Sequence, residues 1–170
     1  MTERVDFYVL KSSTEKQRWT FACRLTEKAY LRDLKVVVLG DTLADVEAID
    51  ALLWTFSERS FVPHDIVRGP QGTPGAASVT SAISAEPSVD SAAGTASPVR
   101  LTQDLDPVGA ADLLVNVSAR LPGRLDRFAR VAEIIDADEE RRRLGRERFR
   151  AYRDLKLTVE THQLEDAAGA

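Results

Sequence analysis

Hydrophobic residues in the first part of the chain change their spacing twice. Residues 4–10, RVDFYVL, are rich in β-branched and aromatic side chains, which predicts a strand. Between Thr14 and Asp33 the hydrophobic residues recur at helical spacing, and Thr14 is placed to cap that helix. Residues 35–40, KVVVLG, form a nearly continuous apolar run, typical of a strand buried on both faces of a parallel sheet. Together the three elements predict a right-handed βαβ unit.

A second helix is predicted for residues 41–56, where hydrophobic residues gather on one side and Asp41 or Thr42 is placed as the cap. Trp54 lies near its C-terminal end, and the segment SFVPH follows at residues 60–64. Pro63 lacks the backbone donor that a central strand needs. The segment is therefore an apolar corner that faces its own core, a substrate or another protein.

The C-terminal half adds further elements. Residues 99–104 and 112–118 predict strands joined by a turn that contains proline and glycine. Residues 123–136 are ambiguous, because their first half fits a short helix whereas residues 129–135, ARVAEII, alternate well enough for a final strand. Residues 138–155 predict a helix with acidic residues in its first turn and arginines behind them, the order that a helix dipole favours.

The order of these elements predicts an α/β fold with a single Rossmann-like domain, in which helices flank a central, mostly parallel sheet. The domain is expected to span residues 1–164, and the short tail 165–170 is expected to fray. A segment rich in Gly, Pro, Ala, Ser and Thr at residues 69–98 interrupts the domain. It has almost no large side chains to bury, so we expect a flexible surface loop.

Composition narrows the class of protein. Hydrophobic residues make up 44% and charged residues 29% of the 170 positions, which is typical of one soluble globular domain. No apolar run is long enough to span a bilayer, and the N-terminus has no signal-peptide layout, so we expect a cytoplasmic protein without membrane association. The net charge of -4 argues against a chain that coats nucleic acid over its whole surface.

The turns that follow the first two predicted strands decide whether a nucleotide site is expected. LKSSTEK, residues 10–16, has no glycine, and LGDTLAD, residues 39–45, has one. Neither turn has the spaced glycines that let backbone amides approach a pyrophosphate, nor the Gly-Lys-Ser/Thr ending of a Walker loop. We therefore predict no nucleotide-binding loop and no cofactor. The alternative that stays open is a nucleotide-dependent enzyme with a degenerate phosphate loop.

Other candidate chemistry is weak. Asp41 and Asp45 could share a magnesium ion, but a cap and a solvated carboxylate are the favoured interpretation. A serine nucleophile beside His64 would lack the glycine-flanked elbow of such sites. Cys23 is the only cysteine and lies mid-helix among apolar neighbours, where an inert thiol is usual, and the only other histidine is the distant His162. We predict no catalytic residue and no metal site.

The predicted helix at residues 138–155 has two different sides. Leu144, Tyr152 and Leu155 suit the core. Arginines and one aromatic gather roughly opposite them: Arg142, Arg146, Phe149, Arg150 and Arg153. These arginines either pair with neighbouring glutamates on a solvated surface or grip carboxylates or phosphates of a ligand. In an acidic chain, one short basic face with an aromatic fits a compact anionic ligand with an apolar anchor better than a long nucleic-acid backbone. Direct DNA binding by this helix is a weaker alternative.

Four stretches occur in the order found in one known family. They are DFYVL near the N-terminus, ALLW, then SFVPH at a fixed distance after Trp54, and finally RERFRAYRDLKLTVET. In this combination the chain resembles the chi subunit family of the bacterial DNA polymerase III holoenzyme. The resemblance covers most of the chain outside residues 69–98, a segment longer than the usual connection in that family. Phe149 stands where relatives often have tyrosine.

The resemblance implies a non-catalytic accessory subunit of the clamp-loader complex, with a Rossmann-like fold and only an indirect association with DNA. It would bridge the psi subunit to the acidic, hydrophobic C-terminal tail of single-stranded DNA-binding protein during DNA replication. Carried over by position, the tail site would comprise Arg142, Arg146, Phe149, Arg150, Ile135 and Thr161. The psi-facing surface would comprise Trp54, Phe61, Val62, Pro63 and His64.

Overall fold

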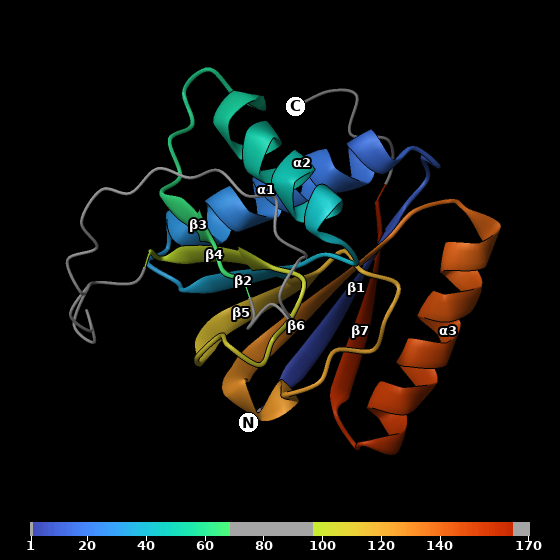
Figure 1. Ribbon diagram of the computed structural model, residues 1–170. Helices are drawn as coiled ribbons and strands as arrows, with labels where there is room; N and C mark the ends of the chain where they lie inside the picture. Colours follow the sequence, from blue (N-terminus) through green and yellow to red (C-terminus); the bar gives the residue numbers. More distant parts are fainter. Residues whose placement is uncertain (1, 69–96, 165–170) are drawn as a thin grey trace, which may run out of the picture.

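The computed structural model describes residues 2–68 and 97–164, which form one central sheet with helices on both faces (Figure 1). In these residues the sheet has seven strands in the order β3-β4-β2-β5-β6-β1-β7. The strands are β1 (Arg4–Leu10), β2 (Val36–Leu39), β3 (His64–Ile66), β4 (Val99–Thr102), β5 (Ala111–Asn116), β6 (Phe128–Ile135) and β7 (Thr158–Leu164). The helices are α1 (Glu15–Tyr30), α2 (Leu43–Thr55), α3 (Glu139–Asp154) and the short 3-10 helix η1 (Leu125–Arg127).

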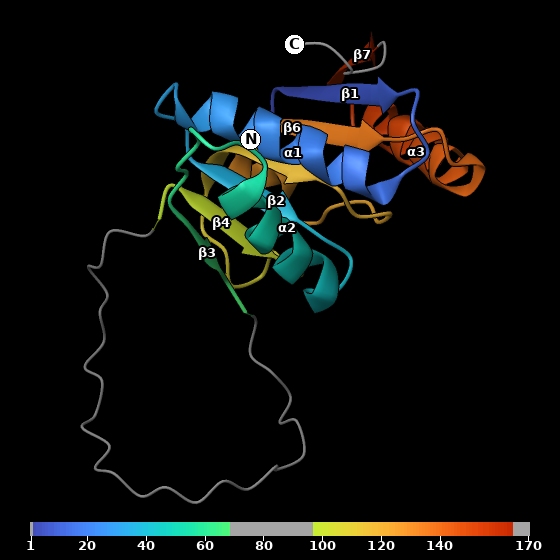
Figure 2. The ribbon, with the colours of Figure 1, turned by 90° about the horizontal axis from the view of Figure 1, so that it is seen from above.

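All pairs of neighbouring strands run parallel, so the predicted α/β Rossmann-like architecture is confirmed and the sheet is wholly parallel. Helices α1 and α2 cover one face, and α3 covers the other (Figures 1 and 2). Strand β2 shows why its sequence is continuously apolar: Val36 and Val38 join the core beneath α1 and α2, whereas Val37 and Leu39 join the core on the α3 side. Both faces of this strand are buried, as expected for a central parallel strand.

The helix caps follow the local sequence. Of the two candidates for α2, Thr42 is the cap: its hydroxyl accepts a hydrogen bond from the backbone N–H of Asp45, and the Asp45 carboxylate accepts one from the backbone N–H of Thr42. This reciprocal pair is a capping box. Thr14 occupies the cap position of α1, but its side chain makes no capping hydrogen bond. Asp138 caps α3 by accepting from the backbone N–H of Arg141 at 3.0 Å.

Two features differ from the sequence prediction. Strand β6 is not the final strand, because β7 follows α3 and pairs with β1 along the sheet edge. Leu155, expected in the core, is 56% exposed just beyond the end of α3. Strand β7 was missed because most of its side chains are polar, as suits an edge strand with partly exposed faces.

Two predicted segments, most of the loop at 69–98 and the tail at 165–170, lie outside the described residues. Among the helices that the structure describes, none has the length and apolar character needed to cross a membrane.

Candidate functional site

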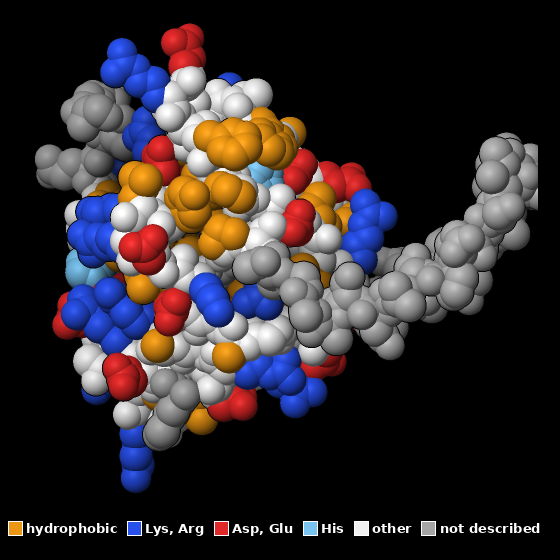
Figure 3. All heavy atoms as spheres, turned by 90° about the vertical axis from the view of Figure 1, so that its left-hand side faces the viewer, with side chains coloured by type: hydrophobic (Ala, Val, Ile, Leu, Met, Phe, Trp, Pro, Cys, Tyr) orange, Lys and Arg blue, Asp and Glu red, His pale blue; other side chains and the backbone are white. Residues whose placement is uncertain are grey.

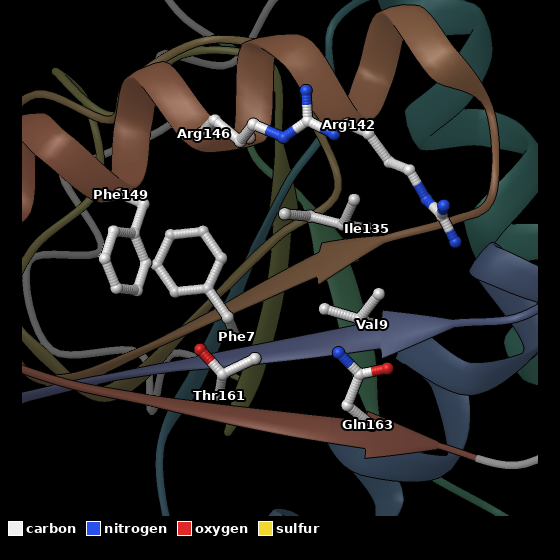
Figure 4. A pocket seen from close by; sticks show the side chains of 9 residues that line it. Phe7, Val9, Ile135, Arg142, Arg146, Phe149, Thr161 and Gln163 are labelled. Carbon is white, nitrogen blue, oxygen red and sulfur yellow. The ribbon is translucent and has the colours of Figure 1, made fainter.

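A pocket of about 300 Å³ lies between α3 and the sheet (Figure 4). Helix α3 forms its roof, and the adjacent strands β6, β1 and β7 form its floor. It is lined by Phe7, Val9, Ile135, Arg142, Gly145, Arg146, Phe149, Thr161 and Gln163. Because these side chains come from three strands and one helix, the pocket exists only in the folded sheet.

Gly145 allows α3 to lie close to the sheet. A Cβ at this position would lie 2.4 Å from Cδ1 of Ile135, closer than real contacts permit, and 3.3 Å from Cγ1, which is a tight contact. Glycine in the interior of a helix costs about 1 kcal/mol relative to alanine. The close approach of α3 to β6 explains why this cost is tolerated, and it leaves the Ile135 side chain at the pocket wall.

A buried polar network fixes α3 on β6. The guanidinium of Arg148 donates to Oε2 of Glu133 at 3.1 Å, and the hydroxyl of Tyr152 donates to Oε1 at 2.5 Å. The side-chain amide of Asn116 also donates to Oε1, at 2.9 Å. Arg148 and Tyr152 are one helical turn apart, so both point inward, while Arg146 and Phe149 lie over the pocket.

Burial is the main influence on the titration of this network. Desolvation raises the pKa of Glu133 above its ordinary value, against the opposing effect of Arg148 and of the hydrogen bonds from Tyr152 and Asn116. Desolvation and the neighbouring Glu133 also raise the pKa of Tyr152, so its hydroxyl stays protonated and acts as a donor. Two side chains of α3, Arg148 and Tyr152, thus donate to one buried carboxyl group on β6.

The arginines of α3 divide into paired and unpaired groups. Arg141 pairs with the buried Asp136 at 2.8 Å, and Arg143 pairs with Glu140 and Glu147 on the solvent side. Arg142 donates to the backbone carbonyl of Asp136 at 3.3 Å, and among the described residues it has no carboxylate partner. Arg146 likewise has no ion-pair partner within the described ranges.

The two guanidinium groups of Arg142 and Arg146 are therefore free to bind an anion, and they lie toward one end of the pocket (Figure 4). The opposite end is aromatic. The rings of Phe7 and Phe149 meet edge to face with centroids 5.4 Å apart. The pocket thus offers two cationic groups at one end and an apolar cavity at the other, which suits an anionic ligand that carries an apolar side chain.

The structure brings together five of the six residues expected in the tail site: Arg142, Arg146, Phe149, Ile135 and Thr161. Arg150 is exposed and does not line the pocket, so its place in the tail site stays a prediction. The remaining lining residues were missed, namely Phe7, Val9, Gly145 and Gln163. A glycine in the middle of a strongly helical segment was the available signal for Gly145. For the strand residues the only signal was alternation along a strand, which does not reveal a neighbour distant in sequence.

The corner at the end of α2 exposes a pair of aromatic side chains. Trp54 is 51% and Phe61 is 68% exposed, and their ring centroids lie 5.5 Å apart. Figure 3 shows hydrophobic side chains gathered in the upper part of the face at the left-hand side of Figure 1. Pro63 is partly exposed. Val62 and His64 are buried, because the chain turns inward there to begin β3, and their place in the psi-facing surface stays a prediction.

The weaker candidates for chemistry have structural roles. Asp41 accepts from the backbone N–H of Ala119, and Asp45 belongs to the capping box of α2. Cys23 is buried in the core, where desolvation raises the pKa of its thiol to about 12. These observations agree with the capping and packing interpretations.

One cluster that the sequence did not indicate joins β1 and β7. Asp6, Glu160 and His162 bring possible metal-binding atoms within 4.8 Å of one another. However, Asp6 already accepts hydrogen bonds from Arg4 at 2.8 Å, from Arg130 at 2.7 Å and from His162 at 3.0 Å. Two arginines at the same carboxylate oppose a further cation, so this cluster is an ion-pair network that ties β7 to the sheet.

Comparison of the folded chain with solved structures shows similarity of fold. The crystal structure of T4 UvsW matches with a TM-score of 0.57 and 11% identity, over 95% of this chain and 41% of that one. An S. cerevisiae Dbp5 variant, solved with Nup159, Gle1, IP6 and ADP, matches with a TM-score of 0.57 and 10% identity, over 97% of this chain and 42% of that one. At these identities the likeness concerns the fold alone.

Comparison of sequences is more specific. A curated protein of Pseudomonas aeruginosa, DNA polymerase III subunit chi, is 30% identical over 161 residues, which cover 95% of this chain and 96% of that protein. The family model described as DNA polymerase III chi subunit, HolC, matches residues 1–160. The chain therefore belongs to the DNA polymerase III chi subunit family.

Proposed function

We propose that this chain is a non-catalytic accessory subunit of the DNA polymerase III clamp-loader complex that bridges two partners. The pocket beneath α3 would bind the acidic C-terminal tail of single-stranded DNA-binding protein. The corner formed by Trp54 and Phe61 would contact the psi subunit. Membership of the chi family supports the link to DNA polymerase III. The two partners are those that the resemblance to this family implies, and the chemistry of each surface supports the assignment.

The observation that carries the tail site is the pairing of two uncompensated guanidinium groups with an apolar cavity. Arg142 and Arg146 can each donate two parallel hydrogen bonds to a carboxylate, and charge-assisted contacts of this kind are among the stronger hydrogen bonds. Phe7, Phe149 and Ile135 offer apolar contact for a terminal side chain. A peptide with aspartates, a free terminal carboxylate and an apolar last residue has both features that this pocket requires.

The size of the pocket also favours a peptide end over a large cofactor. Its volume of about 300 Å³ lies at the lower limit for ligand pockets, which run from about 300 to 1,000 Å³. A large apolar side chain would fit within the cavity, and the charged remainder of the peptide would lie across the arginines at its rim. The arginines of α3 that are already paired, such as Arg143, would contribute little.

The proposed psi surface depends on exposure. Aromatic residues are enriched at the buried centres of protein interfaces, and truncation of such residues often has the largest effect on binding. Trp54 and Phe61 form an exposed pair whose burial by a partner would be favourable. Val62 and His64 are buried beneath this pair and would support it without direct contact.

Calorimetric titration with a synthetic tail peptide tests the first site. We expect binding that weakens with added salt and falls by about tenfold or more in Arg142→Ala and in Arg146→Ala, since a hydrogen bond to a charged group contributes roughly 1.5–3 kcal/mol. Arg143→Ala is the matched control, because this arginine lies on the same helix but pairs with Glu140 and Glu147. Equal affinity in all variants would refute the assigned site.

Two further ligands separate this proposal from direct DNA binding. The same peptide with an amidated C-terminus should bind more weakly, because one carboxylate for the arginines is removed. Bare single-stranded DNA should not compete with the peptide. Competition by DNA that is lost in Arg146→Ala would instead favour nucleic acid as the ligand of the basic helix.

A further inference from the structure

The ring of His64 lies in an unusual polar position beneath the Trp54 and Phe61 pair. Its side chain is fully buried, with 0% exposure. Nδ1 is 2.6 Å from the backbone carbonyl oxygen of Val62, and Nε2 is 3.0 Å from Oδ1 of Asp50. Both ring nitrogens therefore face oxygen atoms that act as hydrogen-bond acceptors.

These contacts decide which protons the ring carries. A carbonyl oxygen only accepts, so Nδ1 must hold a hydrogen and donate it. In a neutral ring Nε2 would then present a bare lone pair to a carboxylate oxygen, which is repulsive. Nε2 of His64 has no partner that satisfies hydrogen-bond geometry, so its contact with Asp50 is not a well-formed hydrogen bond. At a distance of 3.0 Å, the carboxylate of Asp50 nevertheless attracts the ring once Nε2 is protonated.

Trp54 lies directly on this ring. Its centroid is 4.7 Å from that of His64 and 5.5 Å from that of Phe61. A cation within about 6 Å of a tryptophan ring is attracted to its π face, more strongly when the cation is desolvated. Asp50 and Trp54 are one turn apart on α2, so the buried imidazole lies between a partly exposed carboxylate and an exposed indole.

We propose that doubly protonated His64 is a positioning residue that holds Trp54 in its exposed, docking-competent orientation, so that partner docking at this corner is linked to binding of one proton. Loss of the proton replaces the attraction to Asp50 with repulsion and removes the cation from beneath the indole. The link to docking rests on the proposed psi surface, whereas the link between the proton and Trp54 does not.

Few other charges bear on this ring. Within β3 and its neighbour β4, Asp65 and Arg100 are paired in register and lie on the opposite face of the sheet from His64 and Val99. On α2, Glu47 pairs with Arg68 at 3.4 Å. Asp50 is thus the carboxylate that faces His64 among the described residues, and its removal should specifically alter the response to pH.

Nuclear magnetic resonance of the full chain from about pH 5 to about pH 8 tests the proton link, because histidine side chains change charge in this range. Only two histidines occur in the sequence, so His162→Gln assigns the His64 signals. We expect the indole N–H signal of Trp54 to shift with the same midpoint as the His64 ring. Asp50→Asn should uncouple or displace that shift, and Asp65→Asn, a matched loss of one charge on the other face, should leave it unchanged.

A Trp54 signal that does not follow His64, or a ring with one form over the whole range, would overturn the inference. A second arm measures psi affinity at both ends of the range. We expect about a tenfold loss at the higher pH, and no loss in His64→Gln, whose amide does not titrate. If psi binds equally at both values, the docking link fails while the psi surface stands. If psi binds at neither value, the psi surface fails while the resonance measurement still decides the proton link.

Discussion

The pocket beneath α3 and the corner at the end of α2 use aromatic side chains in opposite ways. In the pocket, Phe7 is 2% exposed and meets Phe149 inside the cavity, so the rings shape a wall that exists before any ligand binds. At the corner, Trp54 and Phe61 project into solvent with 51% and 68% of their surface exposed. The first surface is pre-organised for a small ligand, and the second gains most from a partner that covers it.

The supports beneath these surfaces differ in the same sense. The helix over the pocket is fixed by several donors that converge on the buried Glu133. The corner is supported by Val62 in the core and by one histidine that contacts a single carboxylate. The hydrogen-bond network under α3 holds the helix in place over the pocket. The corner has fewer polar contacts, so protonation of one histidine can change the position of the aromatic pair. Changes at the two regions should therefore separate stability from binding.

The largest effect is expected at the support of the pocket. Glu133→Gln removes the charge that Arg148 and Tyr152 contact, and it leaves a buried guanidinium without its counter-ion. Breaking one partner of a buried ion pair costs about 3–5 kcal/mol. We expect a comparable loss in the free energy of unfolding, measured with urea. Arg143→Ala, which breaks only exposed pairs, should leave the free energy of unfolding nearly unchanged. Similar losses in both would contradict this account of α3.

At the corner, a pair of neighbouring substitutions should have opposite outcomes. Val62→Ala deletes methyl groups from a side chain that is 1% exposed and should cost about 1–2 kcal/mol of stability. Phe61→Ala truncates an exposed ring and should leave the melting temperature nearly unchanged while weakening psi binding by about tenfold or more. Thermal melting and co-purification with psi measure the two effects. A large stability loss in Phe61→Ala would place that ring in the core instead.

A smaller, more selective effect is expected for Gly145→Ala. The added Cβ would meet Ile135 at 2.4 Å, and the isoleucine side chain can relieve this contact by turning into the pocket. Alanine also favours the helix by about 1 kcal/mol, which offsets part of the strain. We therefore expect tail affinity to fall several-fold with little change in stability. Ala151→Gly, on the same helix away from the pocket, should lower the stability and leave the tail affinity nearly unchanged. Unchanged peptide affinity in Gly145→Ala would show that Ile135 does not shape the cavity.

The smallest effect concerns Asp6 on β1, which contacts His162 on the edge strand β7. Burial tends to raise the pKa of Asp6, but hydrogen bonds from His162, Arg130 and Arg4 outweigh it, and the net pKa lies below the ordinary value. A carboxyl with a lowered pKa stabilises the fold above its ordinary pKa of about 4, and this contribution is lost as the pH falls through the folded value. The stability difference between the wild type and Asp6→Asn should thus shrink below about pH 4. A difference that stays constant with pH would contradict this.

Much of the fold could be predicted because its signals are local. The apolar run of β2, the helical spacing of α1 and α2, and the acidic start of α3 each depend on residues a few positions apart. Strand β7 escaped prediction because an edge strand needs few apolar side chains, so its pattern is weak. Leu155 was misplaced because helical spacing continues beyond the residue at which the helix ends.

The candidate site could be predicted only in part. The arginine face of α3 was visible as a pattern, but the pattern did not show which arginines pair. Arg141, Arg143 and Arg148 find carboxylates, and Arg142 and Arg146 do not, because their different directions around the helix lead to different neighbours. At the corner, too, the sequence did not show which residues are exposed: Phe61 and Val62 are adjacent in sequence, but Phe61 is exposed and Val62 is buried.

The sequence by itself determined most of the elements and the family, because these depend on short-range spacing and on motifs in a fixed order. Only the tertiary structure decided which residues meet. Phe7 and Thr161 come together because β1 and β7 pair in register, and Gly145 brings a helix from the C-terminal part of the chain against Ile135. Contacts between distant parts of the chain arise from the parallel order of the strands, which no local pattern encodes.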